Sequence, residues 1–367
     1  MIGISIVSLI ILLGVLIFAH ELGHFVVAKR TGVGVLKFSL GFGRKLFGWK
    51  RGETEYMVSM IPLGGYVKLL GESDTEGLDE EDRRRSFSVQ PVWKRIMIVA
   101  AGPTFNILLS VLIFFIVYMA GVPSLASIVG DLQTGSPAEK AGIKTGDEIT
   151  SINGGKTTYW EDISVLISNS KGEPMPIIVS RAGHVKKIIV FPSMMKGKNI
   201  FGEEVSGYKI GISPAGKIIV RKLKPSAAFW GSLKQTWFIT ELTYIGIVKM
   251  IEGVVSPKTL GGPILIAQIA GVEAKEGVVP FVLFMALLSI NLAVLNLLPI
   301  PILDGGHLLF FVIELFKGSE VSIQWRERAQ QIGFMLIVLL MMWVILMDVE
   351  RLNLKVVNEF TRIFTGK

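Results

Sequence analysis

The sequence has no cysteine among its 367 residues and only four histidines. Without cysteine the chain can form no disulfide, and any metal ion must be held by nitrogen and oxygen ligands. Charged residues are also sparse, at 19%, whereas 50% of the residues are hydrophobic. This composition is too apolar for an ordinary soluble globular protein of this length. It indicates a membrane protein with several spans and one small soluble domain.

Asp, Glu, Lys and Arg are absent from four apolar runs, at residues 2–18, 96–122, 278–302 and 332–347. Each run approaches the length of a membrane-spanning helix, although the fourth needs flanking residues or bilayer thinning. A secretory signal peptide is the alternative for the first run, but its helical pattern continues through polar residues, so we interpret it as a retained span. Residues 227–255 are also apolar, yet recurring Lys and Glu favour an amphipathic helix at the membrane surface.

The net charge of +8 raises the question of nucleic-acid binding. The basic residues, however, gather at residues 29–51 and 83–95, which flank the loop between the first two spans. Positively charged loops of membrane proteins face the cytoplasm. We therefore expect no nucleic-acid partner, a cytoplasmic loop at residues 29–95, and an extracytoplasmic segment between the second and third spans.

Two segments outside the spans have strand patterns. Residues 35–49 and 55–70 combine β-branched and aromatic residues with glycines, which predicts short strands and turns. Residues 122–214 alternate strand, turn and helix patterns over a length that suits one small α+β domain. The predicted fold class is a polytopic α-helical membrane protein with four transmembrane helices, a β region and one extracytoplasmic α+β domain.

The sequence HELGH contains the strongest chemical signal. His20 and His24 are four residues apart, so both imidazoles project from one face of a helix and can share a metal ion. Glu21 lies beside them and can take a proton from metal-bound water. A polar cluster at a helix end is the alternative, but these side chains are costly in an apolar span unless they have a function.

A catalytic zinc ion usually has three protein ligands, so the two histidines leave such a site one ligand short. His184 lies in the segment expected outside and is interpreted as a surface histidine. Asp304 and His307 both follow the third span, and Asp304 is favoured because a carboxylate balances the charge of zinc. A turn residue before two glycines is its alternative role. If spans one to three cross alternately, His24 and Asp304 reach the same side of the membrane.

Further candidates lie on the second and third spans. Pro299 and Pro301 prevent a regular helix before Asp304, which frees backbone groups that can orient a ligand or contact a substrate. Asn296 can donate to a substrate carbonyl, and an interhelical hydrogen bond is the competing interpretation. Asn106 has the same two interpretations, with the structural one favoured.

Three motifs resemble those of the bacterial site-2 proteases, which act in regulated intramembrane proteolysis of anti-sigma factors and of signal-peptide remnants. They are FAHELGH at residues 18–24, AGPTFN at residues 101–106 and NLLPIPILDGGH at residues 296–307. GFG around Phe42 and the stretch IPLGGYVKLLGE are similar to the membrane-associated β region of that family. The resemblance covers nearly the whole chain.

The resemblance implies an intramembrane zinc metalloendopeptidase that cleaves single-span membrane proteins in the bacterial cytoplasmic (inner) membrane, with its active site toward the cytoplasm. The implied ligands of one zinc ion are His20, His24 and Asp304, and Glu21 is the implied general base and acid. The resemblance also implies that Asn296, Pro299 and Pro301 help to position the substrate, and Asn106 is kept as a further candidate for substrate contact.

The sequence GSPAEKAGIKTGDEITSING resembles bacterial PDZ domains. Some relatives carry two such domains in tandem, whereas residues 122–214 have room for one. A PDZ groove takes a chain end or an extended strand, so the resemblance implies a peptide partner for this extracytoplasmic domain. A spacer that merely excludes bulky substrates is the alternative.

These considerations predict an order of segments along the chain. They are transmembrane helix 1 (1–28), the cytoplasmic β region and loop (29–95), transmembrane helix 2 (96–121), the PDZ domain (122–214), the interfacial amphipathic region (215–277), transmembrane helix 3 (278–303), a cytoplasmic loop (304–331), transmembrane helix 4 (332–347) and a C-terminal tail (348–367).

Two other functions compete with proteolysis. The chain could be a membrane scaffold or chaperone that binds through its PDZ domain and has lost catalysis, but HELGH is intact and Asp304 follows it. A metal transporter would use the same ligands, but transporters tend to show internal repeats, which this sequence lacks.

Overall fold

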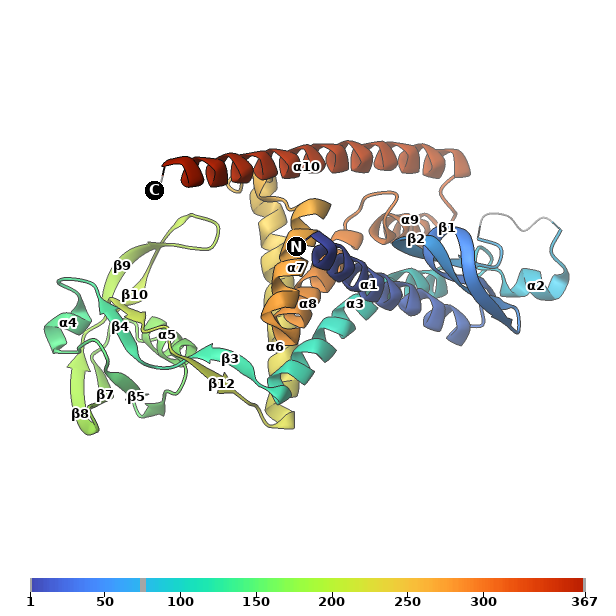
Figure 1. Ribbon diagram of the computed structural model, residues 1–367. Coiled ribbons are helices and arrows are strands. Elements are labelled where there is room, and N and C mark those ends of the chain that lie inside the picture. The colour runs from blue at the N-terminus through green and yellow to red at the C-terminus, as the bar shows by residue number, and fades with distance from the viewer. Residues whose placement is uncertain (1, 73–76, 366–367) are drawn as a thin grey trace. The chain divides into compact units, whose positions relative to one another are not determined.

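The computed structural model describes residues 2–72 and 77–365 (Figure 1). The chain divides into two compact units, each with a buried apolar core. The first unit comprises Met1–Ile116, Ala228–Ile247 and Ser256–Lys367, and the second comprises Val117–Ala227 and Val248–Val255.

The first unit is mainly helical. Its helices are α1 (Ile2–Arg30), α2 (Glu80–Arg85), most of α3 (Val92–Ala120) and α6 (Pro225–Ile251), the short 3-10 helix η1 (Pro257–Thr259), α7 (Pro263–Glu276), α8 (Val278–Asn296), α9 (Asp304–Lys317) and α10 (Ile323–Thr365).

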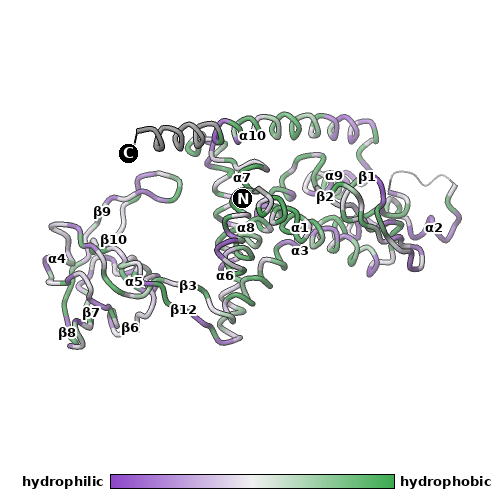
Figure 2. The backbone as a smooth tube through the Cα atoms, in the orientation of Figure 1, coloured by the Kyte–Doolittle hydropathy of each residue, from purple (hydrophilic) through white to green (hydrophobic). Residues whose placement is uncertain are grey.

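Four helices in the described part of the chain are long and apolar enough to cross a membrane. They are Gly3–Arg30, Val92–Ala120, Val278–Asn296 and Ile323–Leu352. The predicted number of spans is therefore confirmed, and Figure 2 shows hydrophobic residues along α1, α3 and α8. α6, in which Lys and Glu recur, is not among the four.

The last helix, α10, begins at Ile323, upstream of the uncharged run, and its first turns contain Arg326, Glu327 and Arg328. Its Asp348 is only 2% exposed and accepts hydrogen bonds from the backbone N–H groups of Gly262, Ile264 and Leu265, at 3.0–3.1 Å. These donors belong to the start of α7 and have no partner within that helix. Asp348 therefore caps the start of α7 and holds α10 against it.

A β region follows α1, as the sequence predicts. β1 (Val35–Arg51) and β2 (Thr54–Leu69) are antiparallel and irregular in register. Residues 35–40 pair on one side with residues 65–69 and on the other side with residues 55–58. Residues 65–69 therefore form an outer edge of the sheet, and β2 packs against α1 (Figure 1).

A buried cluster joins the elements that carry the predicted site. It includes Ala28 of α1, Val35 of β1, Leu69 of β2, Ile98 of α3 and Phe311 of α9. Because interiors are close-packed, this contact fixes the start of α3 and the body of α9 relative to the end of α1.

The second unit is rich in β structure. Its strands are β3 (Val122–Leu125), β4 (Val129–Leu132), β5 (Glu148–Ile152), β6 (Gly155–Lys156), β7 (Met175–Arg181), β8 (His184–Val190), β9 (Ser193–Lys198), β10 (Glu204–Lys209), β11 (Ile212–Pro214) and β12 (Ile218–Arg221). Its two short helices are α4 (Pro137–Ala141) and α5 (Trp160–Ser168).

The strands of the second unit form one four-stranded antiparallel sheet, β6-β5-β7-β8, and three two-stranded pairs. Asp147 precedes β5, and its carboxylate is fully buried. It accepts hydrogen bonds from Nε (2.7 Å) and Nη2 (2.8 Å) of Arg181 on β7. Burial alone would raise the pKa of Asp147, but these bonds and the N–H of Lys144 hold it below its ordinary value.

Candidate active site

α1 carries the HELGH residues in an unbroken helix. The rings of His20 and His24 lie 4.8 Å apart and nearly perpendicular, and their Nε2 atoms are separated by 3.2 Å. This is the result of the four-residue spacing on one helical face. Both Nε2 atoms therefore point to one place.

Asp304 reaches the same place from another part of the chain. Its Oδ2 lies 3.2 Å from Nε2 of His20 and 3.7 Å from Nε2 of His24. α8 ends at Asn296 and α9 begins at Asp304, and the turns between them contact Gly305 and Gly306 so closely that a Cβ on either glycine would collide with backbone. The two glycines let Asp304 start its helix directly against this loop.

α3 orients the two imidazoles. Nδ1 of His24 lies 2.9 Å from the carbonyl oxygen of Ile98, to which it can donate. Nδ1 of His20 lies 3.4 Å from the side-chain amide of Asn106. Gly102, between these two positions on α3, leaves the space that both rings occupy, because a Cβ there would meet Nε2 of His24 and Cε1 of His20. Both rings thus direct Nε2 toward Asp304.

The donor set fits a zinc ion. Two imidazole nitrogens and one carboxylate oxygen suit zinc, and bond lengths of about 2.0–2.1 Å place tetrahedral ligands about 3.3 Å apart. The three separations between Nε2 of His20, Nε2 of His24 and Oδ2 of Asp304 are 3.2, 3.2 and 3.7 Å. Oδ2 of Asp304 is also buried without a hydrogen-bond partner, which is consistent with a role as a metal ligand.

A cavity of about 570 Å³ opens onto these residues. Glu21 lines it beside His20, His24 and Asp304, and the backbone N–H of Val67 donates to the Glu21 carboxylate. The cavity wall also includes the sheet edge at residues 65–67 and polar residues from the first turns of α10. A carboxylate, a candidate metal site and a sheet edge therefore meet in one accessible space.

The other predicted residues have different places. His307 lines the cavity, and burial lowers its pKa below the ordinary value, but the cluster with metal-binding geometry in the described part of the chain contains Asp304 instead. Asn296, Pro299 and Pro301 are not among the residues that line the cavity. His184 lies on β8 of the second unit and is exposed.

The sequence interpretation missed the positioning groups around the histidines. Gly102 and the Ile98 carbonyl lie in or beside AGPTFN, whose resemblance to a family motif was the available signal. Gly65 was also missed: a Cβ there would approach Ile17 and Cγ of Glu21 at about 2.9–3.0 Å. The sequence indicated strands and turns around residues 64–65 but not this contact with Glu21.

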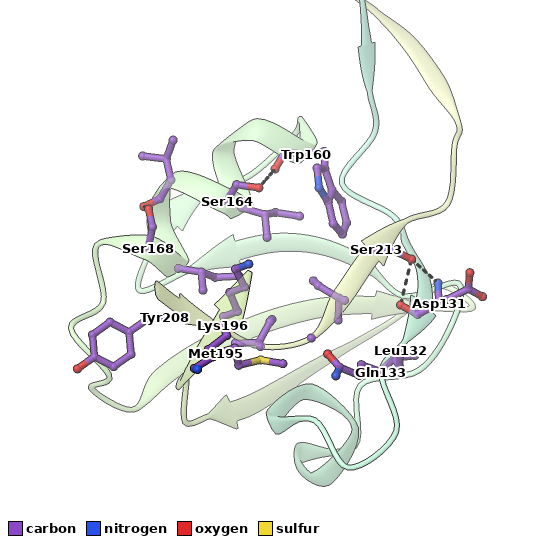
Figure 3. A pocket seen from close by; sticks show the side chains of 17 residues that line it. Asp131, Leu132, Gln133, Trp160, Ser164, Ser168, Met195, Lys196, Tyr208 and Ser213 are labelled. Carbon is purple, nitrogen blue, oxygen red and sulfur yellow. Dashed lines mark hydrogen bonds between the residues drawn. The ribbon is translucent and has the colours of Figure 1, made fainter. Parts of the chain in front are cut away.

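The second unit contains a separate cavity of about 870 Å³ (Figure 3). It lies between α5 and the segment from Tyr208 to Ser213. Its apolar lining includes Trp160, Ile163 and Ile167 of α5, and Ile210 and Ile212 opposite them. This is a largely apolar site bounded by a helix and a strand.

Comparison with known proteins adds independent information. The sequence profile of Peptidase family M50 matches residues 8–340. A protein of Clostridium acetobutylicum that is provisionally named a zinc metalloprotease is 37% identical over 345 residues, which cover 94% of this chain and 97% of that protein. Protease RseP of Yersinia pestis and the regulator of sigma-E protease RseP of Salmonella typhimurium are each 31% identical, over 95% of this chain and 99% of theirs. Their alignments extend over 454 and 448 residues, so these relatives carry segments that this chain lacks.

Proposed function

Because the chain belongs to Peptidase family M50, and so is a site-2-type zinc metalloprotease of the inner membrane, we propose that His20, Glu21, His24 and Asp304 form its active site. The observation that carries this proposal is the convergence of the three potential ligands beside Glu21 in one cavity. An intramembrane protease sits in the lipid and acts on membrane proteins. The substrates that we propose are single-span proteins of the anti-sigma-factor or signal-peptide-remnant class, and the name of the Salmonella relative supports the first class.

In this proposal His20, His24 and Asp304 hold one zinc ion. When bound, the ion supplies a Lewis acid that polarises the scissile carbonyl and lowers the pKa of the attacking water. Glu21 accepts the proton of that water and delivers it to the leaving amine. Asn296, Pro299 and Pro301 remain proposed substrate contacts, which would require the substrate to extend beyond the cavity.

The substrate must be extended at the site of cleavage, because a helix buries its amides in its own hydrogen bonds. In the described part of the chain no further strand pairs with the outer edge of β2 at residues 65–69, where the Val67 N–H donates to the Glu21 carboxylate and Gly65 lies against Glu21. An extended substrate can add to such an edge as a further strand. Replacement of Val67 by proline removes the edge N–H that bonds Glu21, so we expect it to lower the cleavage rate both by releasing Glu21 and by hindering strand addition.

We further propose that the active site faces the cytoplasm and that the second unit is extracytoplasmic. The charge clusters after α1 and before α3 support this orientation. The lack of native cysteine allows a clean test, since any introduced cysteine is the sole thiol. A membrane-impermeant maleimide added to intact spheroplasts should label a Lys187→Cys variant on β8 and spare a Lys50→Cys variant on β1. The reverse labelling would overturn the orientation.

The second unit is proposed to be a PDZ domain that takes a peptide or chain end. The apolar cavity between α5 and β11 supports this, because an extended peptide can pair with the strand while its side chains enter the cavity. Binding of a labelled peptide with an apolar last residue should weaken when its carboxylate is amidated. Equal binding of both peptides would indicate recognition of an extended strand without its chain end, and binding of neither would favour the spacer interpretation.

Cleavage of a single-span model substrate by purified protein tests the central proposal. We expect Glu21→Gln to lower the rate by about 10²–10⁴, as for loss of a general acid and base, while zinc content stays unchanged. Glu241→Gln, the same change at an exposed position of α6, is the matched control. Full activity of Glu21→Gln would refute the assignment, and binding without cleavage by the wild type would favour a scaffold.

A further inference from the structure

Asn106 is a fully buried polar side chain that touches the proposed site without facing the substrate. It is 0% exposed, lies on α3, and is not among the residues that line the active-site cavity. Its side-chain amide is 3.4 Å from Nδ1 of His20, the ring nitrogen that faces away from Asp304. Its position therefore favours a role that acts through His20.

The two histidines are held in parallel ways. His24 donates through Nδ1 to the carbonyl of Ile98, while His20 presents Nδ1 to Asn106, two turns further along α3. A metal-bound imidazole almost always donates its other ring N–H to an oxygen, which fixes its tautomer and orientation. For His24 that oxygen belongs to the backbone, so for His20 it must come from a side chain.

The amide of Asn106 can supply this oxygen. In the structure, Nδ2 of Asn106 faces His20, and Oδ1 is buried without a hydrogen-bond partner. A half-turn of the amide exchanges its two ends without changing its shape. Oδ1 then accepts the Nδ1–H of His20, and the orphaned acceptor gains a donor. Without this half-turn, Nδ1 of His20 would have to accept a hydrogen bond from Nδ2 of Asn106. The ring proton of His20 would then lie on Nε2 and block metal binding.

The backbone of Asn106 is fixed against the neighbouring helix. Its carbonyl oxygen lies 2.8 Å from Oγ of Ser289 on α8 and 3.1 Å from Oγ of Ser110. Ser110 also lies 2.9 Å from the carbonyl oxygen of Ala286 on α8. These contacts tie α3 to α8 at Asn106, so its side chain has a defined direction toward His20.

We propose that Asn106 is a positioning residue that accepts a hydrogen bond from Nδ1 of His20 and thereby presents Nε2 to the zinc ion. This inference rests on the proposed zinc site. It replaces the predicted role of Asn106 in substrate contact with one that acts through His20.

The test measures zinc affinity of the purified full-length protein by competition with a chromophoric chelator, in a Glu21→Gln background that prevents self-cleavage. Asn106→Leu removes the acceptor at similar volume and should weaken zinc binding about 10–100-fold. Asn106→Asp keeps an acceptor and should stay within about threefold of the parent. Asn291→Leu is the matched control, because Asn291 on α8 bonds Thr243 instead of a histidine.

The ligand field of bound Co²⁺ supplies a second readout that packing alone would not change. We expect the visible spectrum of the Asn106→Leu variant to shift and that of Asn106→Asp to match the parent. If Asn106→Leu does not fold, the smaller Asn106→Ala replaces it with the same expectation. Parent-like zinc affinity of the Leu or Ala variant would overturn the proposal, and so would an equal loss for Asp and Leu.

A His20→Ala variant separates this inference from the proposed function. If it binds zinc as tightly as the parent, the zinc site itself is wrong, and the Asn106 proposal is overturned with it. If His20→Ala loses zinc while Asn106→Leu keeps it, the site stands and only the role of Asn106 falls.

Discussion

Replacing Arg95 by methionine should destabilise the protein and weaken its metal site together. Arg95 lies at the start of α3, with its side chain 5% exposed, and its Nη2 is 2.5 Å from Oε1 of Glu314 on α9, which is 12% exposed. Its Nε donates to the carbonyl of Gln90 at 3.0 Å, and its guanidinium lies 5.0 Å from the ring centre of Phe311. This ion pair joins α3, whose Ile98 carbonyl bonds His24, to α9. α9 begins with Asp304, the proposed third ligand.

The magnitude follows from burial. Removing one partner of a buried ion pair costs about 3–5 kcal/mol, because the other charge stays buried and unpaired. The second partner, Glu320, is 52% exposed at 3.5 Å, so it adds at most about 1 kcal/mol. Replacing both buried charges by apolar groups of similar volume is often nearly neutral. Arg95→Met should therefore cost about 3–5 kcal/mol, and the additional change Glu314→Met should recover most of that loss.

A double-mutant cycle on the full-length protein checks this reasoning. The free energy of unfolding is measured by SDS titration in mixed micelles for the parent, both single variants and the double variant, and zinc affinity is measured for each. We expect a coupling energy of at least about 2 kcal/mol and weaker zinc binding in both single variants. Additive stability changes, or a double variant as unstable as Arg95→Met, would refute the structural reasoning.

Three further predictions follow from other contacts. Gly102→Ala should abolish tight zinc binding, because its Cβ would enter the space of both imidazoles, although alanine normally favours a helix by about 1 kcal/mol; unchanged zinc affinity would contradict this. The folded pKa of Asp147 is depressed, so its stabilising effect is complete above its unfolded pKa of about 3.9 and is lost as the pH falls through the folded value. Arg181→Met removes the bonds that depress this pKa, so acid unfolding, followed by tryptophan fluorescence, should move to higher pH. Finally, chelation should stop cleavage of the model substrate and added zinc should restore it, whereas irreversible loss would indicate unfolding.

Local patterns made much of the fold and site predictable. Spans follow from uncharged apolar length, and the shared face of His20 and His24 follows from helical period, so both depend only on neighbours in the chain. The hairpin after α1 was predicted from strand composition, but the double pairing of residues 35–40 was not. That pairing depends on bulges and on packing against α1, which sequence periodicity does not encode.

The substrate-contact predictions illustrate the limit of local reasoning. Asn296 and Pro299 lie in the motif that leads to Asp304, yet the path of the turns carries them outside the lining of the cavity. Their proposed role remains a prediction. Asn106, by contrast, faces His20 across two helices, and nothing in its own neighbourhood of sequence specifies that direction.

The class of protein, the spans, the helical face of the two histidines and the candidates for the third ligand could all be inferred from the chain alone, because they depend on composition and on residues a few positions apart. Three contacts follow instead from packing in three dimensions: Asp304 rather than His307 meets both Nε2 atoms, Gly102 makes room for the rings, and the edge of β2 reaches Glu21. These contacts join α1 to residues tens to hundreds of positions away. Their geometry is set by close packing of several elements at once, which no single stretch of sequence contains.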